Sequence, residues 1–140
     1  MIQGSHVWKM PPADAGKALE HFKAKLELET DAWDLHEDLK AGVPGLVVVD
    51  ARKAAAYEGG HIPGAINLYH RDMDEKRTAG WSKNDLYVVY CVSVGCNASS
   101  KGCLNLAALG FQVKELLDGL HAWEDHGYPV ALGKEAGKLP

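Results

Sequence analysis

Leu86-Tyr87-Val88-Val89-Tyr90-Cys91 and the earlier run Leu46-Val47-Val48-Val49-Asp50 are the two stretches of this sequence that decide its fold. Neither run shows the polar alternation of a half-exposed strand. Uninterrupted apolar runs of this length are typical of strands buried on both faces, as in a parallel sheet covered by helices. We therefore predict two core strands, one closed by an aspartate and the other by a cysteine.

A helix is expected over residues 13–26, because apolar residues recur there at helical spacing among charged ones. The members of this stripe are Ala15, Leu19, Phe22 and Leu26. Its apolar face either packs on the chain's own domain or meets a partner.

The rest of the chain continues an alternation of strands and helices. A short strand over residues 26–29 precedes a helix that has Thr30 as its N-cap and ends near Gly42. The expected elements after Cys91 are a helix stopped by Gly110, a strand over 111–117 and a helix over 119–126. This order predicts an α/β domain with a mostly parallel central sheet flanked by helices.

We divide the chain into three segments on this basis. Residues 1–25 form an N-terminal helical extension, residues 26–132 form the α/β domain, and residues 133–140 form a polar tail that we expect to be frayed.

Composition narrows the classes of function. The 140 residues are 46% hydrophobic and 24% charged, as in an ordinary globular domain. A net charge of −4 argues against a nucleic-acid partner, since phosphate binding needs a clustered basic surface. No apolar run approaches the roughly 20 residues that span a membrane, and residues 1–6 lack the segments of an export signal. We expect a soluble cytoplasmic protein without a membrane partner.

Three cysteines lie close together in the sequence: Cys91, Cys96 and Cys103. Their odd number, without an export signal, argues against a disulfide framework. Their spacings of five and seven residues do not match the short cysteine or histidine pairs of a zinc site. We therefore expect neither a metal nor another cofactor.

Cys91 is the candidate nucleophile because ligands of open parallel sheets bind at the carboxyl ends of the strands. If the following loop curls around the sulfur, its N–H groups and the next helix N-terminus point inward and favour a thiolate. The alternative is that Cys91 is a small buried residue that finishes a strand. The candidate substrate-binding loop consists of Val92, Ser93, Val94, Gly95, Cys96, Asn97, Ala98 and Ser99, and holds no Asp, Glu, Arg or Lys.

Five short motifs, in order, resemble the rhodanese family over about residues 26–132. They are Asp50-Ala51-Arg52, Tyr57-Glu58-Gly59-Gly60-His61-Ile62-Pro63-Gly64-Ala65-Ile66-Asn67, Val88-Val89-Tyr90-Cys91, Leu109-Gly110-Phe111, and Leu117-Asp118-Gly119 with Ala122-Trp123 and Tyr128-Pro129-Val130. The resemblance implies a single rhodanese-like domain in which Cys91 accepts a sulfane sulfur as a persulfide. The family then passes that sulfur to an acceptor such as cyanide or a thiol.

Three further motif residues are expected to support the site. Asp50 ends its strand on the same sheet edge as Cys91, and an ion pair with Arg52 is the natural way to hold it there. His61 follows a glycine in a rigid turn containing proline, where it is either a base or, as we favour, a structural hydrogen-bonding residue. Trp123 is expected in the core.

The loop departs from the common form of the family. From Cys91 to Gly110 it is about two residues longer, and Gly95-Cys96-Asn97 resembles a subgroup of the family. The arginine of common rhodanese loops is missing, and so is the arginine of the phosphatase-like branch. Phosphatase activity is disfavoured because a phosphate dianion at a thiolate needs positive charge. We also expect thiosulfate to be a poorer donor than, for example, a protein persulfide.

Cys96 is the one thiol in the loop beyond the nucleophile, and it has two interpretations. It is either a structural residue or a resolving thiol that attacks a persulfide or an oxidised form of Cys91.

Two classes of function remain. The first is a rhodanese-type sulfurtransferase that moves sulfur from thiosulfate or another sulfane donor, with a small sulfur compound or a protein persulfide or thiol as partner. The second is a non-catalytic or redox-sensing rhodanese-like binding module.

Overall fold

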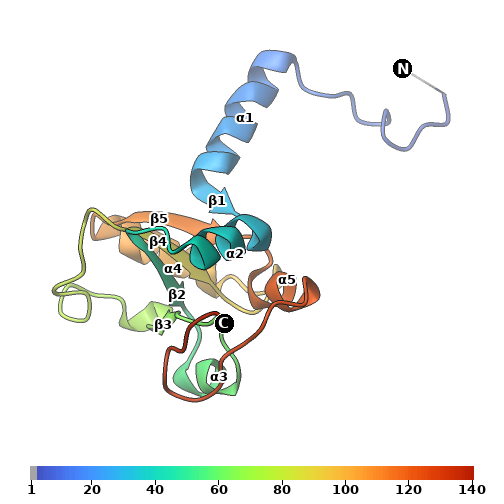
Figure 1. The fold of residues 1–140 in the computed structure, drawn as a ribbon. Coiled ribbons are helices and arrows are strands. Elements are labelled where there is room, and N and C mark those ends of the chain that lie inside the picture. Colours follow the sequence, from blue (N-terminus) through green and yellow to red (C-terminus); the bar gives the residue numbers. More distant parts are fainter. Residues whose placement is uncertain (1–2) are drawn as a thin grey trace.

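Five parallel strands form the central sheet of the computed structural model, which describes residues 3–140 (Figure 1). Their order across the sheet is β1-β5-β4-β2-β3, so β4 lies in the middle. The strands are β1 (Glu29–Thr30), β2 (Leu46–Asp50), β3 (Ile66–Asn67), β4 (Leu86–Tyr90) and β5 (Gln112–Leu116). The register pairs Asp50 with Tyr90, so the carboxyl ends of β2 and β4 lie side by side. The α/β fold with a mostly parallel sheet is confirmed.

The helices are α1 (Ala15–Leu28), α2 (Ala32–Ala41), α3 (Ala54–Gly59), the 3-10 turn η1 (His70–Asp72), α4 (Ala98–Ala108) and α5 (Gly119–Asp125). Four of them, α1, α2, α4 and α5, lie close to the predicted positions, whereas α3 and η1 were not predicted. Helix α2 is capped by the side chain of Asp31, which accepts a 2.8 Å bond from the Asp34 amide. The prediction of Thr30 as N-cap is therefore wrong, since Thr30 belongs to β1. The strand predicted over residues 26–29 is largely a continuation of α1.

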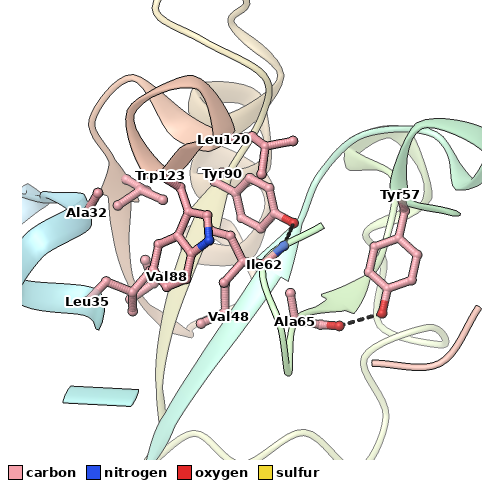
Figure 2. Packing of buried hydrophobic residues seen from close by; sticks show 11 residues of the cluster. Ala32, Leu35, Val48, Tyr57, Ile62, Ala65, Val88, Tyr90, Leu120 and Trp123 are labelled. Carbon is pink, nitrogen blue, oxygen red and sulfur yellow. Dashed lines mark hydrogen bonds between the residues drawn. The ribbon is translucent and has the colours of Figure 1, made fainter. Parts of the chain in front are cut away.

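Both faces of the sheet are covered, which explains the unbroken apolar runs. On one face, α2 and α5 enclose a cluster that includes Val48, Val88, Tyr90 and the fully buried Trp123. Figure 2 shows the indole among these residues and the Tyr90 hydroxyl accepting a 3.0 Å bond from the Ile62 amide. The core position of Trp123 is confirmed.

The other face of the sheet is covered by α4. Its cluster contains Val49, Val89, Leu106 and Phe111, of which the two valines alternate with those that face the first cluster. Alternate residues of one strand therefore serve two separate cores.

Helix α1 stands apart from the rest of the chain (Figure 1). None of its residues is buried, and the exposed fractions of Leu19, Phe22 and Leu26 are 71%, 57% and 72%. It is attached near its end, where the Lys114 ammonium donates a 2.9 Å bond to the Leu26 carbonyl. Of the two interpretations of the apolar stripe, packing on the chain's own domain is therefore wrong.

The C-terminal segment is docked rather than frayed. The Gly133 amide donates to the Glu58 carbonyl at 2.8 Å, and the Gly64 amide donates to the Ala136 carbonyl at 2.8 Å. Leu139 packs against the first cluster. The fraying that we expected for residues 133–140 is thus wrong, because the Glu58 carbonyl of α3 and the Gly64 amide of the following turn hold this segment.

Within residues 3–140, the helices are all too short or too polar to cross a membrane.

Candidate functional site

Cys91 directly follows β4, the middle strand, at the carboxyl edge of the sheet. Only 1% of its surface is exposed. The start of α5 anchors the backbone there, since the Leu120 amide donates to the Cys91 carbonyl at 2.9 Å and the His121 amide donates to the Val92 carbonyl at 2.8 Å. The loop then leads through residues 92–97 into α4.

The Cys91 sulfur faces hydrogen-bond acceptors. Its Sγ lies 3.1 Å from the Cys96 carbonyl oxygen, 3.6 Å from the Ser93 carbonyl oxygen and 3.3 Å from the Ser99 hydroxyl. Two of these three groups can only accept, so the arrangement suits a protonated thiol as the donor. The loop residues do curl around the sulfur, but they present carbonyl groups to it.

The predicted cradle of inward N–H groups is therefore wrong for this conformation. Three loop amides have other acceptors: Val94 donates to Asp118 Oδ1 at 2.9 Å, Gly95 to the Ser93 hydroxyl at 3.3 Å, and Cys96 to the Ser93 carbonyl at 3.1 Å. The bond from Cys96 to Ser93 closes a tight turn, which rotates the peptide groups away from the sulfur.

Two carboxylates from outside the loop border it. Glu115 of β5 accepts hydrogen bonds from the hydroxyls of Ser99 (2.7 Å) and Ser100 (2.5 Å). Asp118, in the turn before α5, accepts one from Val94 and lies 2.7 Å from His121 Nδ1. Sequence reasoning missed both acids. Glu115 could have been predicted as a site residue, because it lies near the carboxyl end of a strand next to β4.

At this loop, the contact between Asp118 and His121 shifts the pKa of both side chains. The hydrogen bond from His121, and then the one from the Val94 amide, lower the pKa of Asp118. The hydrogen bond and the charge of Asp118 in turn raise the pKa of His121. Both side chains lie at the surface, so solvent screens the pair.

A pocket of about 160 Å³ opens between the loop and the end of β5. Loop residues including Cys96 and Ser99 line one side, and Glu115 and Asp118 line the other. No Lys or Arg of the described chain is among its lining residues.

Gly119 holds the loop and α5 in close contact. A Cβ atom at this position would lie 2.0 Å from the Cys91 carbonyl oxygen, and its φ of 49° is in the left-handed region. The preceding Asp118 also has a left-handed φ of 58°. Glycine is thus required where α5 meets the end of β4.

The predicted ion pair between Asp50 and Arg52 is present. The guanidinium donates to both carboxylate oxygens, with 2.7 Å between Nη2 and Oδ2, and also to the Gly60 carbonyl at 2.7 Å. Burial alone would lower the pKa of Arg52, but the hydrogen bond and charge of Asp50 raise it. Asp50 is fully buried, so this pair belongs to the frame of the sheet edge.

His61 is fully buried and makes structural contacts. Its Nδ1 lies 2.8 Å from the Tyr57 carbonyl oxygen and its Nε2 lies 3.1 Å from the Ala136 carbonyl oxygen. The ring also stacks on Tyr57 with 3.7 Å between centroids. With both nitrogens engaged by the backbone, the structural interpretation of His61 fits these contacts and a role as a base does not.

The other two cysteines differ in their surroundings. Cys96 is half-buried and lines the pocket beside the loop. Cys103, on α4, packs against the second cluster, where burial and then the charge of Glu115 raise the pKa of its thiol to about 12. Across residues 3–140, no three His, Cys, Asp or Glu side chains gather in a way that could hold a metal ion.

Comparison with known proteins places this geometry in a family. The BH2092 protein from Bacillus halodurans has a crystal structure that is 37% identical, with a TM-score of 0.83 over 86% of this chain and 88% of that one. The solution structure of the rhodanese-like domain of the Alr3790 protein from Anabaena sp. is 30% identical, with a TM-score of 0.68 over 79% of this chain and 83% of that one.

A curated relative is larger than this chain. The HTH-type transcriptional regulator Rv0324 of Mycobacterium tuberculosis is 32% identical over 92 residues, which are 66% of this chain and 40% of the regulator. The chain thus spans two-fifths of the length of that relative. The sequence profile of the Rhodanese-like domain matches residues 30–126. By this match, the chain belongs to the rhodanese-like domain family.

Proposed function

We propose that the chain is a rhodanese-type sulfurtransferase that carries a sulfane sulfur on Cys91 and passes it to a thiol or cyanide-type acceptor. The observation that carries this proposal is the cysteine at the carboxyl end of the middle strand, where a loop curls around its sulfur. This edge is where parallel sheets bind their ligands. The rhodanese-like fold of the chain is compatible with that chemistry.

The transfer takes two displacements. The Cys91 thiolate attacks the outer sulfur of the donor, a new S–S bond forms, and the donor leaves with the electron pair of the broken bond. The acceptor thiolate or cyanide then attacks the terminal sulfur of the persulfide, and Cys91 leaves as a thiolate. No net oxidant or reductant is consumed. Burial of Cys91 keeps the persulfide away from bulk water between the two steps.

We infer that the donor is not a small dianion. The pocket beside the loop has Glu115 and Asp118 on its wall and no Lys or Arg. An approaching thiosulfate would meet like charge without a compensating cation. An organic persulfide, free or on a protein, carries less charge at the reacting sulfur and fits this wall better.

The test is the mass of the intact protein after incubation with a sulfane donor. Wild type should gain one sulfur, about 32 Da, and should gain it faster from an organic persulfide than from thiosulfate at equal concentration. Cys91→Ser should gain none, because its hydroxyl stays protonated and is a weak nucleophile. Cys103→Ser is the matched control and should load like wild type. Sulfur on the Cys91→Ser protein would contradict the assignment.

A redox-sensing or binding module is the second candidate. It is favoured by the acceptor groups around the Cys91 sulfur, which suit a resting thiol, and by the curated relative being named a transcriptional regulator. If wild type acquires no sulfur from any donor, this candidate replaces the sulfurtransferase.

A further inference from the structure

A chain of hydrogen bonds links the candidate nucleophile to a carboxylate on the neighbouring strand. Cys91 Sγ lies 3.3 Å from the Ser99 hydroxyl, and that hydroxyl lies 2.7 Å from Glu115 Oε2. Ser99 has only 4% of its surface exposed. The register of β4 and β5 explains the placement, because Val89 pairs with Glu115, and Cys91, two residues after Val89, points to the same face.

The positions of the protons along these hydrogen bonds follow from the number of donors and acceptors that each group has. An ionised carboxylate can only accept, so the single hydrogen of the Ser99 hydroxyl points at Glu115. The Ser99 oxygen therefore offers only lone pairs to the sulfur, as do the carbonyls of Ser93 and Cys96. A thiolate at Cys91 would face three oxygen lone pairs and no donor, whereas a thiol can donate to them.

We infer that Glu115 is a positioning residue that opposes the ionisation of Cys91 by holding the Ser99 hydroxyl away from the sulfur. Ionisation requires this hydroxyl to turn from Glu115 to the sulfur, while the Cys91 proton leaves to a solvent base. Ser100 keeps its 2.5 Å bond to Glu115, so the carboxylate remains hydrogen-bonded after Ser99 turns. This inference bears on when the proposed nucleophile becomes reactive.

Other titratable groups around this hydrogen-bond chain lie on the neighbouring helices and strands and in the loop. Cys103 faces Glu115 from α4, and Glu29 of β1 pairs with Glu115 in register while forming a 3.1 Å ion pair with Lys25. Asp118 and His121 pair with each other in the turn before α5 and in α5 itself, and Cys96 lies in the loop. Among these groups Glu115 alone reaches Cys91 through a hydroxyl, so a variant of Glu115 isolates the effect.

The experiment is the rate of iodoacetamide alkylation of Cys91 across pH, read by mass spectrometry on the separated peptides. Glu115→Gln removes the charge and lets Ser99 donate to the sulfur, so the alkylation of Cys91 at neutral pH should become about tenfold faster. Glu29→Gln removes a neighbouring carboxylate without a hydroxyl link and should change the rate less than twofold. In the Glu115→Gln background, Ser99→Ala should remove most of the gain, since the new donor is lost.

An equal or slower rate in Glu115→Gln than in wild type would overturn the inference, and so would a gain that persists without Ser99. Rapid labelling of Cys103 would show that a variant has unfolded. In that event Glu115→Asp, whose shorter side chain retracts from Ser99, should show a gain in the same direction. Alkylation needs no sulfur donor, so this outcome is independent of whether the chain proves to be a sulfurtransferase.

Discussion

The ends of β2 and β4 lie side by side in the sheet and are built in opposite ways. At the end of β2, the fully buried carboxylate of Asp50 is matched by the partly buried guanidinium of Arg52, which also donates to a backbone carbonyl. At the end of β4, Cys91 is surrounded by acceptors, and the nearby acids bond to hydroxyls, an amide and one exposed histidine. The contacts at the end of β2 cannot be broken without leaving the buried charge of Asp50 unpaired.

The contacts at the end of β4 can be broken and replaced by others at a lower cost. The contacts of the Cys91 loop are single hydrogen bonds, several of them to the carboxylates of Glu115 and Asp118. Losing one of them costs less than removing the partner of a buried charge. The proposed sulfur transfer requires the loop to admit a donor and then an acceptor, and contacts of this strength are compatible with that requirement. The comparison indicates that rearranging the β4 loop costs less than disturbing the end of β2.

The largest effect is expected at the β2 end. Arg52→Ala leaves Asp50 buried without its partner, and breaking a buried pair in this way costs about 3–5 kcal/mol. We expect this loss in the free energy of unfolding measured with urea. Arg77→Ala is the control, because Arg77 pairs with Asp72 at 3.9 Å on the surface, and should cost less than about 0.5 kcal/mol. Equal costs for the two variants would show that the β2 end is no more rigidly built than the surface.

The next effect is expected where α5 touches the β4 end. In Gly119→Ala the new methyl group would lie 2.0 Å from the Cys91 carbonyl oxygen, so the loop or α5 must shift. We expect a loss of about 2 kcal/mol or more in stability, together with slower sulfur loading on Cys91. Gly127→Ala has a similar left-handed φ of 77° but no atom within 4 Å, so it isolates the cost of backbone strain alone. If both variants lose the same stability, the close contact is not what matters.

The sequence predicted the parts of this comparison that depend on short-range pattern. The apolar runs located β2 and β4, the strand-end rule placed Asp50 and Cys91 on one edge, and the spacing of Asp50 and Arg52 indicated their pairing. Each of these follows from residues that are neighbours in the chain or from a general property of parallel sheets.

The missed parts depend on which distant segments meet. Asp118 reaches Val94 across 24 residues, and nothing in the loop sequence indicates that its amide has a side-chain acceptor. The docked tail is held by backbone hydrogen bonds and by the side chains of His61 and Leu139. Hydrogen bonds between distant backbone groups leave no mark in the sequence. The stripe of α1 shows which residues share a face, but periodicity does not say what covers that face.

A third prediction concerns Cys96, whose two interpretations both remain open. The turn over residues 93–96 brings its carbonyl oxygen to 3.1 Å from Cys91 Sγ, so the two residues are neighbours in space. As a resolving thiol, Cys96 would attack Cys91 Sγ of the persulfide. A Cys91–Cys96 disulfide would form, sulfide would leave, and an external thiol would have to reduce the bond.

Mild peroxide tests this role without a sulfur donor. Peroxide converts Cys91 to a sulfenic acid, and condensation with the Cys96 thiol gives the same disulfide and water. Peptide mapping without reduction should find the Cys91–Cys96 disulfide as the main product, and Cys103→Ser should leave that product unchanged. Over-oxidised Cys91 beside a free Cys96 thiol would assign Cys96 to structure.

The smallest effect is expected from the Asp118–His121 pair, which holds the loop through the Val94 amide. The raised pKa of His121 means that the contribution of its charge is complete below its unfolded pKa and is lost as pH rises through the folded one. Asp118, with its lowered pKa, contributes above its unfolded pKa and loses that contribution as pH falls through the folded one. The pair therefore stabilises the loop at mildly acidic to near-neutral pH. The charges of Asp125 and Glu124 also raise the pKa of His121, after the larger effect of Asp118.

Hydrogen exchange of the Val94 amide, compared between His121→Gln and wild type at each pH, isolates this contribution from the general rise of exchange with pH. We expect exchange about twofold faster in the variant at mildly acidic pH, an effect the size of an exposed pair, and equal rates above the pKa of His121. His21→Gln, on the distant α1, should match wild type at every pH. A difference that persists unchanged at high pH would mean that His121 holds the loop by packing and not by charge.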